Sequence, residues 1–253
     1  MLPRIIPTLL LKKTGLVKGI AFQNHKYIGD PINAVRIFSE KEVDELFFLD
    51  ITAAFEKRSP SVELVRHIAE ECYMPFCVGG GISTVKHVHE LLYAGAEKVC
   101  VNTHALENPD FIPEIAGQFG SQSLVVSIDV KKKSGVYSVY SHCGTRQTRW
   151  TANEWAKEVE QRGAGEILLT SIEQEGSMQG YDVDLLRRIS DAVQIPVIAG
   201  GGAGTLAHFK QAIELGHASA VSAGSLFVFY KSRNAVLIHF PSRQEIEKTL
   251  GVS

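Results

Sequence analysis

Short apolar segments alternate with amphipathic segments through most of the chain. Residues 44–51, DELFFLDI, form an almost continuous apolar run, and residues 59–72, SPSVELVRHIAEEC, carry apolar side chains at helical spacing. A run without polar alternation is typical of a strand that is buried on both faces of a parallel sheet. The pattern therefore predicts buried strands that alternate with amphipathic helices.

The same alternation predicts the other elements. Further helices are expected at residues 83–95, 183–193 and 205–216. Further strands are expected near Ile5 and Val125 and at residues 75–81, 98–102, 165–171, 195–202 and 220–225. Each half of the chain then holds four strand–helix units.

An internal repeat relates the two halves. A shift of 121 positions carries Gly79–Gly81 onto Gly200–Gly202, and the match extends over much of each half without an insertion. Two related sets of four strand–helix units predict an α/β fold, a (β/α)8 TIM barrel built from two homologous half-barrels. We expect one domain over residues 1–253, with half-barrels of approximately 1–121 and 122–253.

Composition narrows the class of protein. The formal charge of −2 and the 45% hydrophobic content give no electrostatic case for nucleic acid or a membrane surface. No apolar run reaches the roughly 20 residues of a membrane span, and the N-terminus does not resemble a signal peptide. The four cysteines show no CxxC pairing, which favours reduced thiols in the cytoplasm. The histidines form no cluster of metal ligands, and no metal is expected.

The ends of the strands hold the candidate chemistry, because active sites of such barrels lie at the C-terminal ends of the strands. Each glycine triplet follows a strand and precedes a helix, where backbone amides and the helix N-terminus can bind phosphate. The alternative is that these glycines only make tight turns. Two cradles on opposite sides predict a substrate phosphorylated at both ends. The cradle residues are Gly80, Gly81, Asn102 and Thr103 in one half and Gly201, Gly202, Gly224 and Ser225 in the other.

One strand end carries a candidate acid or base. When RIIPTLLLKKTG is laid over SLVVSIDVKKKSG, a shift of 119 places Leu10 against Asp129. An aspartate that ends a buried strand can act as a general acid or base with a raised pKa. The alternative is a carboxylate that caps the next turn or pairs with a following lysine. Other polar residues expected to bind the substrate are Asp50, Thr170, Ser171, Glu175 and Lys18.

Four charged residues also stand at the starts of strands, at the opposite end of the predicted barrel. We interpret all four strands as odd-numbered strands of the barrel, counted along the chain. Charged residues at strand ends are commonly just solvated, but alternating signs at matching places can form a ring of salt bridges across the barrel floor. The four residues are Arg4, Glu45, Lys98 and Glu166.

The chain resembles the cyclase subunit of imidazole glycerol phosphate synthase along nearly its whole length. The stretches that carry the resemblance are RIIP, GDPINA, DELFFLDITAAFEKR, PFCVGGGI, ENP, QRGAGEILLTSI, GYD and GGAG. The resemblance implies a heterodimer with a glutaminase subunit docked on the N-terminal face of the barrel. Ammonia from that partner would pass a gate formed by the four charged residues. It would then react with a doubly phosphorylated ribulosyl aminoimidazole, without a metal or organic cofactor.

The sequence departs from the family at the acid–base pair. The family uses two aspartates, one after the first strand of each half; the second matches Asp129, whereas the family pattern LDVKDG reads LLLKKTG here and places Leu10 at the first. Glu175 also replaces an aspartate, and the tail from Phe229 is unlike that of the histidine enzyme. Leucine cannot exchange a proton, which argues against efficient cyclisation by the standard route.

Three functions follow from these observations. The first is a cyclase-type lyase that retains Asp129 and compensates for Leu10. The second is an ammonia-channelling subunit, similar to paralogues associated with amidination of a surface-polysaccharide sugar. The third is a phosphosugar isomerase on the same plan, which would also need two strand-end aspartates and would leave the charged ring without a role.

Overall fold

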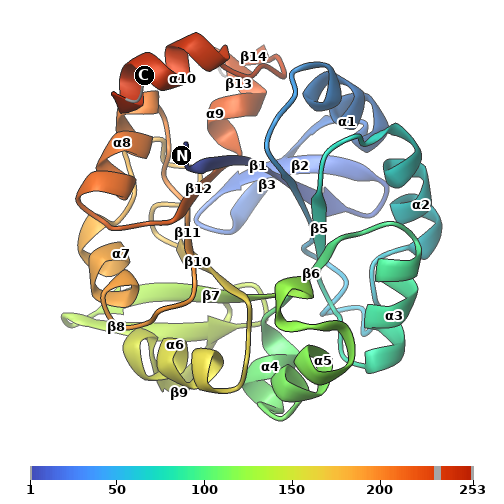
Figure 1. Ribbon diagram of the computed structural model, residues 1–253, viewed down its shortest axis with the longest axis vertical. Coiled ribbons are helices and arrows are strands. Elements are labelled where there is room, and N and C mark those ends of the chain that lie inside the picture. The colour runs from blue at the N-terminus through green and yellow to red at the C-terminus, as the bar shows by residue number, and fades with distance from the viewer. Residues whose placement is uncertain (1, 231–234, 252–253) are drawn as a thin grey trace.

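Eight parallel strands close into a barrel in the computed structural model, which describes residues 2–230 and 235–251 (Figure 1). In the sheet, β10, β11, β12, β1, β4, β5, β6 and β7 follow one another, and β10 pairs with β7 to close the circle. The predicted (β/α)8 TIM barrel is confirmed. The barrel strands are β1 (Arg4–Lys12), β4 (Leu46–Asp50), β5 (Phe76–Gly79), β6 (Lys98–Val101), β7 (Leu124–Lys133), β10 (Glu166–Ser171), β11 (Val197–Gly200) and β12 (Ala220–Ala223).

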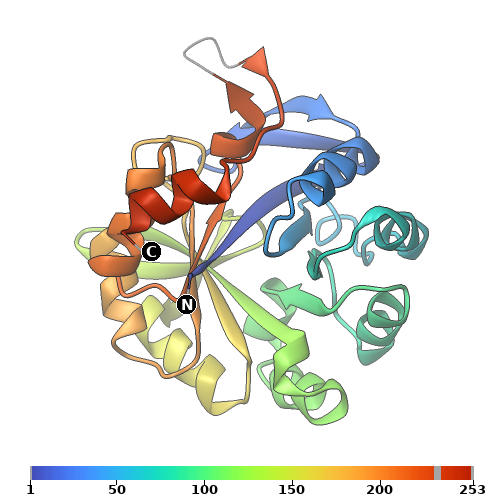
Figure 2. The same cartoon turned by 45° about the horizontal axis from the view of Figure 1, so that its top comes forward.

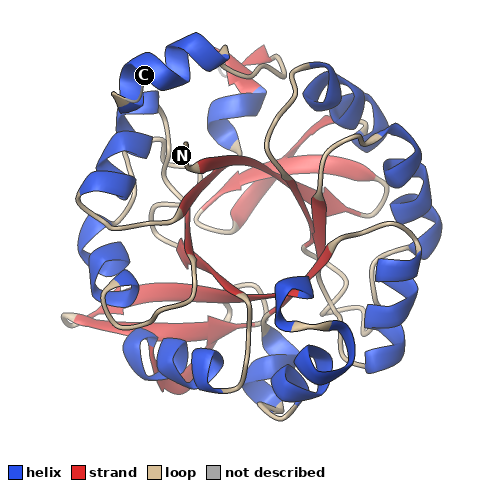
Figure 3. Cartoon of the chain, viewed as in Figure 1, coloured by secondary structure: helices blue, strands red, loops and turns tan. Residues whose placement is uncertain are grey.

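Helices surround the barrel on its outer side (Figure 3). Most begin with a side-chain cap; for example, Ser61 accepts a hydrogen bond from the amide of Leu64. Their apolar faces pack on the outer surface of the sheet, as the sequence pattern predicts. The helices are α1 (Pro31–Glu40), α2 (Val62–Glu71), α3 (Val85–Tyr93), α4 (Thr103–Glu107), α5 (Phe111–Phe119), α6 (Ala152–Gln161), α7 (Val183–Ser190), α8 (Leu206–Glu214), α9 (Ser225–Val228) and α10 (Arg243–Leu250), with a 3-10 turn at Ser121–Ser123.

Two antiparallel extensions were not predicted. The strands β2 (Gly15–Ile20) and β3 (Gln23–Gly29) continue from β1, and β8 (Val136–Ser141) and β9 (Arg146–Thr151) continue from β7. Each extension therefore follows the first strand of a half-barrel. Their strands are short and partly polar, so the search for apolar runs does not detect them.

A short pair of strands follows α9 near the C-terminus. β13 (Phe229–Tyr230) pairs with β14 (Ala235–Val236) at the rim of the barrel, and α10 then contacts α8 (Figure 2). The divergent tail noted from the sequence begins here, and its residues 231–234 lie outside the described residues.

A small apolar core fills the barrel itself, separate from the larger core between sheet and helices. This inner core lies between the charged residues at the starts of the strands and the polar residues at their ends, so it separates the two ends of the barrel. Among the helices of residues 2–230 and 235–251, none is both long and apolar enough to cross a membrane. The inner core consists of Ile6, Phe47, Cys77, Cys100, Val125, Leu168, Ile198 and Ala220.

Candidate active site

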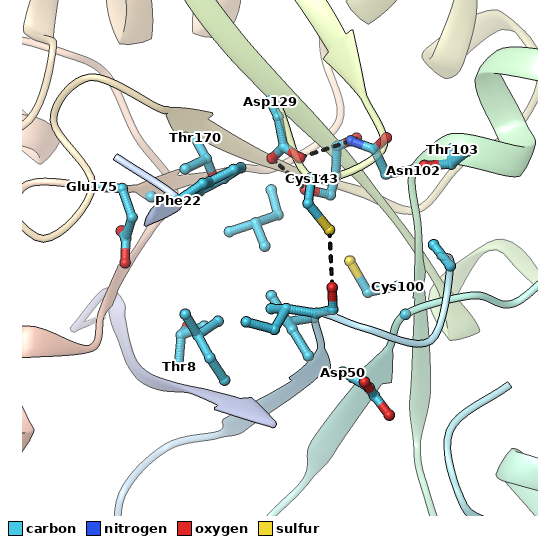
Figure 4. Close-up of a pocket in the computed structure, with 18 of the residues that line it drawn as sticks. Thr8, Phe22, Asp50, Cys100, Asn102, Thr103, Asp129, Cys143, Thr170 and Glu175 are labelled. Atoms are coloured by element: carbon cyan, nitrogen blue, oxygen red, sulfur yellow. Dashed lines mark hydrogen bonds between the residues drawn. The ribbon is translucent and has the colours of Figure 1, made fainter. Parts of the chain in front are cut away.

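A cavity of about 590 Å³ opens at the C-terminal ends of the barrel strands (Figure 4). Its volume is in the range of sites for small molecules. The cavity brings together nearly all the residues predicted to bind substrate. These are Lys18, Asp50, Gly80, Gly81, Asn102, Thr103, Asp129, Thr170, Glu175, Gly201, Gly202, Gly224 and Ser225.

Ser171 is the exception among the predicted residues. Its neighbour Thr170 lines the cavity, whereas Ser171 is buried and does not. Successive side chains of a strand point to opposite faces, so only one of the two can face the barrel interior. The contribution of Ser171 is its carbonyl oxygen, which accepts hydrogen bonds from the amides of Gln174 and Glu175.

The glycines of the two cradles are required by close backbone contacts. Gly80 and Gly202 have φ angles of 112° and 114°, which favour glycine. A Cβ atom on Gly202 would lie 2.0 Å from the carbonyl oxygen of Gly180. A Cβ atom on Gly80 would lie 2.2 Å from the carbonyl oxygen of Asp50. Each loop is therefore held tightly against the loop that follows the preceding barrel strand.

The cradles lie on opposite sides of the same cavity. One is formed after β5 and β6 and the other after β11 and β12, four strands apart around the barrel. Lys18 from β2 reaches the second cradle, because a Cβ atom on Gly224 would lie 2.1 Å from its Nζ atom. Lys18 is 2% exposed and forms an ion pair of 2.8 Å with Glu175. The second cradle thus combines backbone groups with a buried positive charge.

The Thr103 side chain at the first cradle has one hydrogen-bonding role already filled. Its Oγ1 atom accepts a hydrogen bond of 3.0 Å from the amide of His142, in the turn between β8 and β9. The hydroxyl proton is therefore available to another acceptor in the cavity. Sequence reasoning missed His142 and its neighbour Cys143, whose Sγ atom donates to the carbonyl of Ile51. Both lie in a turn between two short, partly polar strands, which a search for apolar runs does not detect.

Asp129 lies in the buried part of β7 and faces the cavity (Figure 4). Its carboxylate accepts hydrogen bonds from Ser127 Oγ at 3.1 Å and from Asn102 Nδ2 at 3.0 Å. Burial raises the pKa of Asp129 to about 7, with the hydrogen bond from Ser127 opposing the shift and the negative charge of Glu175 adding to it. A carboxyl with this pKa can both accept and donate a proton near neutral pH. These partners do not match the alternative roles of Asp129, which were to cap the next turn or to pair with a following lysine.

Leu10 lines the cavity on the strand opposite Asp129. β1 and β7 are four strands apart around the barrel, and Leu10 pairs in register with Leu49 of β4. Leu49 and Ile51 also line the cavity. Apolar side chains at Leu10, Leu49 and Ile51 therefore share this side of the cavity with Thr8, Lys12 and Asp50, whereas Asp129 lies on the strand opposite.

The carboxylate of Asp50 is engaged by its own loop. It accepts hydrogen bonds from the amides of Thr52 and Ala53 and forms an ion pair of 2.6 Å with Arg58. These contacts fix the loop after β4, against which the first glycine cradle packs. We interpret Asp50 as a residue that shapes the cavity wall.

The four charged residues at the other end form a closed ring. Arg4 lies 2.5 Å from both Glu45 and Glu166, and Lys98 lies 3.0 Å from both carboxylates. Glu45 is 1% exposed, and burial raises its pKa.

The expectation that the ring residues occupy four odd-numbered strands is wrong. Glu45, Lys98 and Glu166 open the second, fourth and sixth barrel strands, and only Arg4 belongs to an odd-numbered one. Side chains of alternate strands share a layer of a barrel, and the long Arg4 side chain reaches into that layer from the first strand.

Within the described residues, no group of histidine, cysteine or acidic side chains is arranged to hold a metal ion. The four cysteines are free thiols. Burial raises the pKa of Cys143 to about 12, so this thiol in the cavity wall is a neutral hydrogen-bond donor.

Comparisons with known proteins show what this chain is similar to. Residues 4–233 match the model of a family described as "Histidine biosynthesis protein". The chain is 49% identical over 245 residues to "Putative imidazole glycerol phosphate synthase subunit hisF2" of Pseudomonas aeruginosa, covering 96% of this chain and 98% of the relative. It is 49% identical over 228 residues to "Imidazole glycerol phosphate synthase subunit HisF" of Thermococcus onnurineus, covering 90% of each chain. A protein of Leptospira borgpetersenii named "Putative imidazole glycerol phosphate synthase subunit HisF" is 46% identical, over 97% of each chain.

Proposed function

The chain belongs to the histidine biosynthesis protein family, among relatives named as the HisF subunit of imidazole glycerol phosphate synthase, and on this premise we propose that it is an ammonia-using, cyclase-type lyase subunit. Its substrate is a ribulosyl aminoimidazole-like molecule with a phosphate at each end. Its ammonia comes from a glutaminase partner. The observation that carries the proposal is one cavity with a glycine cradle on each of two opposite sides and Asp129 between them.

The two cradles support a substrate with two phosphates. Backbone amides at glycine loops and helix N-termini favour anions, and Lys18 adds a positive charge at the second cradle. A substrate held at both ends has its central part fixed between Asp129 and Leu10 on the opposite strand. Fixing the reacting part of the substrate in this way lowers the entropic part of the barrier.

Asp129 supports acid–base chemistry at the centre of the cavity. Its pKa of about 7 means that both protonation states are populated near neutral pH. Asn102 and Ser127 hold the carboxyl in place. In the proposed reaction Asp129 moves protons during ring closure, and Leu10 on the opposite strand takes no part in proton transfer.

The charged ring supports delivery of ammonia from the opposite face. A glutaminase docked on the N-terminal face would release ammonia at Arg4, Glu45, Lys98 and Glu166. The barrel interior beyond the ring is lined by apolar residues such as Phe47 and Leu168. Uncharged ammonia crosses such an interior at far lower cost than the ammonium ion. A closed ring requires movement of at least one of its side chains before ammonia can pass.

A second candidate function is favoured by Leu10. In this alternative the chain channels ammonia for amidination of a surface-polysaccharide sugar and does not make imidazole glycerol phosphate. An apolar side chain at the first of the family's two aspartate positions agrees with chemistry that needs one carboxyl group in the cavity, or none.

Product analysis separates the two functions. The purified chain is incubated with the doubly phosphorylated ribulosyl aminoimidazole and ammonium salt at alkaline pH, which makes a glutaminase partner unnecessary. Formation of imidazole glycerol phosphate and the aminoimidazole carboxamide ribotide supports the lyase. Binding of the substrate without either product would overturn the lyase proposal and favour the ammonia-channelling function.

A further inference from the structure

Two histidines occupy the same place behind the two glycine cradles. His87 Nδ1 accepts a hydrogen bond of 3.5 Å from the amide of Ser83, and His208 Nδ1 accepts one of 3.1 Å from the amide of Gly204. In α3 and in α8 the histidine is the third residue after the N-cap threonine. The shift of 121 positions relates both the histidines and their donors, so the two half-barrels share this contact.

The contact resembles a capping box in which the carboxylate has been replaced. In a capping box, a glutamate or glutamine at the third helical position reaches back to accept a backbone amide. α6 and α10 use this arrangement, with Glu154 accepting from the amide of Thr151 and Glu245 from that of Ser242. None of these four residues lines the cavity. The helices at the cradles thus make a similar reach-back contact with an imidazole, which accepts from the amide one residue before the N-cap.

The replacement removes negative charge from the helix ends that face the cradles. Because Nδ1 accepts the hydrogen bond, the neutral ring carries its proton on Nε2. The four helices that begin at the cradles, α3, α4, α8 and α9, have no acidic residue in the first turn. Of the other six helices in the described residues, α2, α5, α6, α7 and α10 each have one and α1 has none. A carboxylate at a helix N-terminus satisfies the helix dipole but repels a second anion bound there.

We propose that His87 and His208 are positioning residues that hold the glycine loops with an uncharged acceptor, so that each helix N-terminus stays available to a substrate phosphate. The inference rests on the proposed function, because it takes the two cradles to be phosphate sites. A glutamate at either position would hold the loop equally well and would weaken the binding of phosphate.

A pair of variants that differ only in charge tests this role. His208→Gln and His208→Glu have side chains of the same length, and both can reach back to accept an amide at the start of α8, as Glu154 does in α6. Inorganic phosphate is titrated into each purified variant by calorimetry, with thermal melting as the control for folding. We expect the glutamate variant to bind phosphate about three- to tenfold more weakly than the glutamine variant, at similar melting temperatures. The same pair at His87 is expected to behave in the same way.

A matched control comes from a helix without a cradle. Glu154→Gln in α6 removes a carboxylate from the same helical position and should leave phosphate affinity unchanged. If a glutamine variant does not fold, His208→Asn and His208→Asp repeat the comparison with a shorter side chain.

The outcomes separate this inference from the function on which it rests. Equal phosphate affinity in the glutamine and glutamate variants, with the wild type binding phosphate, would overturn the role of the histidines and leave the cradles intact. A wild-type chain that binds no phosphate at millimolar concentration would overturn the cradles themselves, and the role of the histidines with them.

Discussion

The two half-barrels agree at their glycine loops and disagree at the ends of their first strands. Gly80 and Gly202 hold matching loops against neighbouring backbone segments of the same chain. His87 and His208 make the same contact behind these loops. By contrast, the C-terminal part of the first strand carries Leu10 in one half and Asp129 in the other. The parts that would bind the ends of a substrate are therefore shared, and the parts that would act on its centre are not.

This difference indicates how a duplicated barrel can change its chemistry. The loops are constrained by backbone contacts that admit only glycine, so a substitution there disturbs two loops at once. A side chain at a strand end points into an open cavity and can change without moving the backbone. Leu10 pairs in register with the apolar Leu49, and both line the cavity.

The largest effect is expected from removing the carboxyl group of Asp129. Asp129→Asn keeps the shape of the side chain but cannot transfer a proton. Turnover of the doubly phosphorylated substrate with ammonium should fall about 10²- to 10⁴-fold. Substrate affinity should change much less, because the cradles are untouched. Asp184→Asn, an aspartate outside the cavity that pairs with Arg188, is the control, and equal turnover in the two variants would contradict a proton-transfer role for Asp129.

The raised pKa of Asp129 also predicts a pH-dependent stability. Below about pH 4 the carboxyl is protonated in both the folded and the unfolded chain. Between about pH 4 and pH 7 only the unfolded chain releases the proton, since the pKa rises from 3.8 to about 7 on folding. The free energy of unfolding should therefore fall as pH rises through this window, by up to about 4 kcal/mol, and then level off.

Asp129→Asn removes this contribution. Urea denaturation of the wild type and the variant at several pH values gives the difference between their free energies of unfolding. The free energy of unfolding of the variant, relative to that of the wild type, should rise from pH 4 to pH 7. Parallel pH profiles for the two proteins would show that Asp129 is not the buried titrating group.

A smaller effect, on the free energy of unfolding, is expected at the charged ring, which joins the two halves at the N-terminal end of the barrel. Arg4→Met removes the ion pairs to Glu45 and Glu166 and leaves the buried Glu45 paired with Lys98 alone. The free energy of unfolding in urea should fall by about 1–3 kcal/mol. Arg36→Met, which breaks the exposed pair with Glu71, should cost much less, because solvent screens an exposed ion pair. Similar losses in both variants would contradict a larger contribution of the ring to the free energy of unfolding than that of an exposed ion pair.

The fold was predictable from the sequence because its evidence is distributed over many residues. Buried parallel strands leave continuous apolar runs, and the repeat shows that four units occur twice. The glycine triplets located both cradles, because tight turns and close backbone approach leave few alternatives to glycine.

Other features of the site depend on contacts that sequence patterns do not contain. The hairpins β2–β3 and β8–β9 have short, partly polar strands, so the cavity residues His142 and Cys143 were missed. Thr170 and Ser171 could not be separated, because which of two neighbours faces the barrel interior depends on strand register. The reach-back contact of His208 requires the position of its ring relative to the amide of Gly204.

The most direct test of the proposed active site is to make the two first strands alike. Ammonium-driven turnover of the doubly phosphorylated ribulosyl aminoimidazole is measured for the wild type and for Leu10→Asp, with substrate affinity measured in parallel. The proposed cyclase-type site predicts that the variant binds the substrate as the wild type does and forms imidazole glycerol phosphate faster, by about 10²-fold or more. A Leu10→Asp variant that binds the substrate but turns it over no faster than an inactive wild type would contradict the assignment of this cavity as a cyclase-type active site.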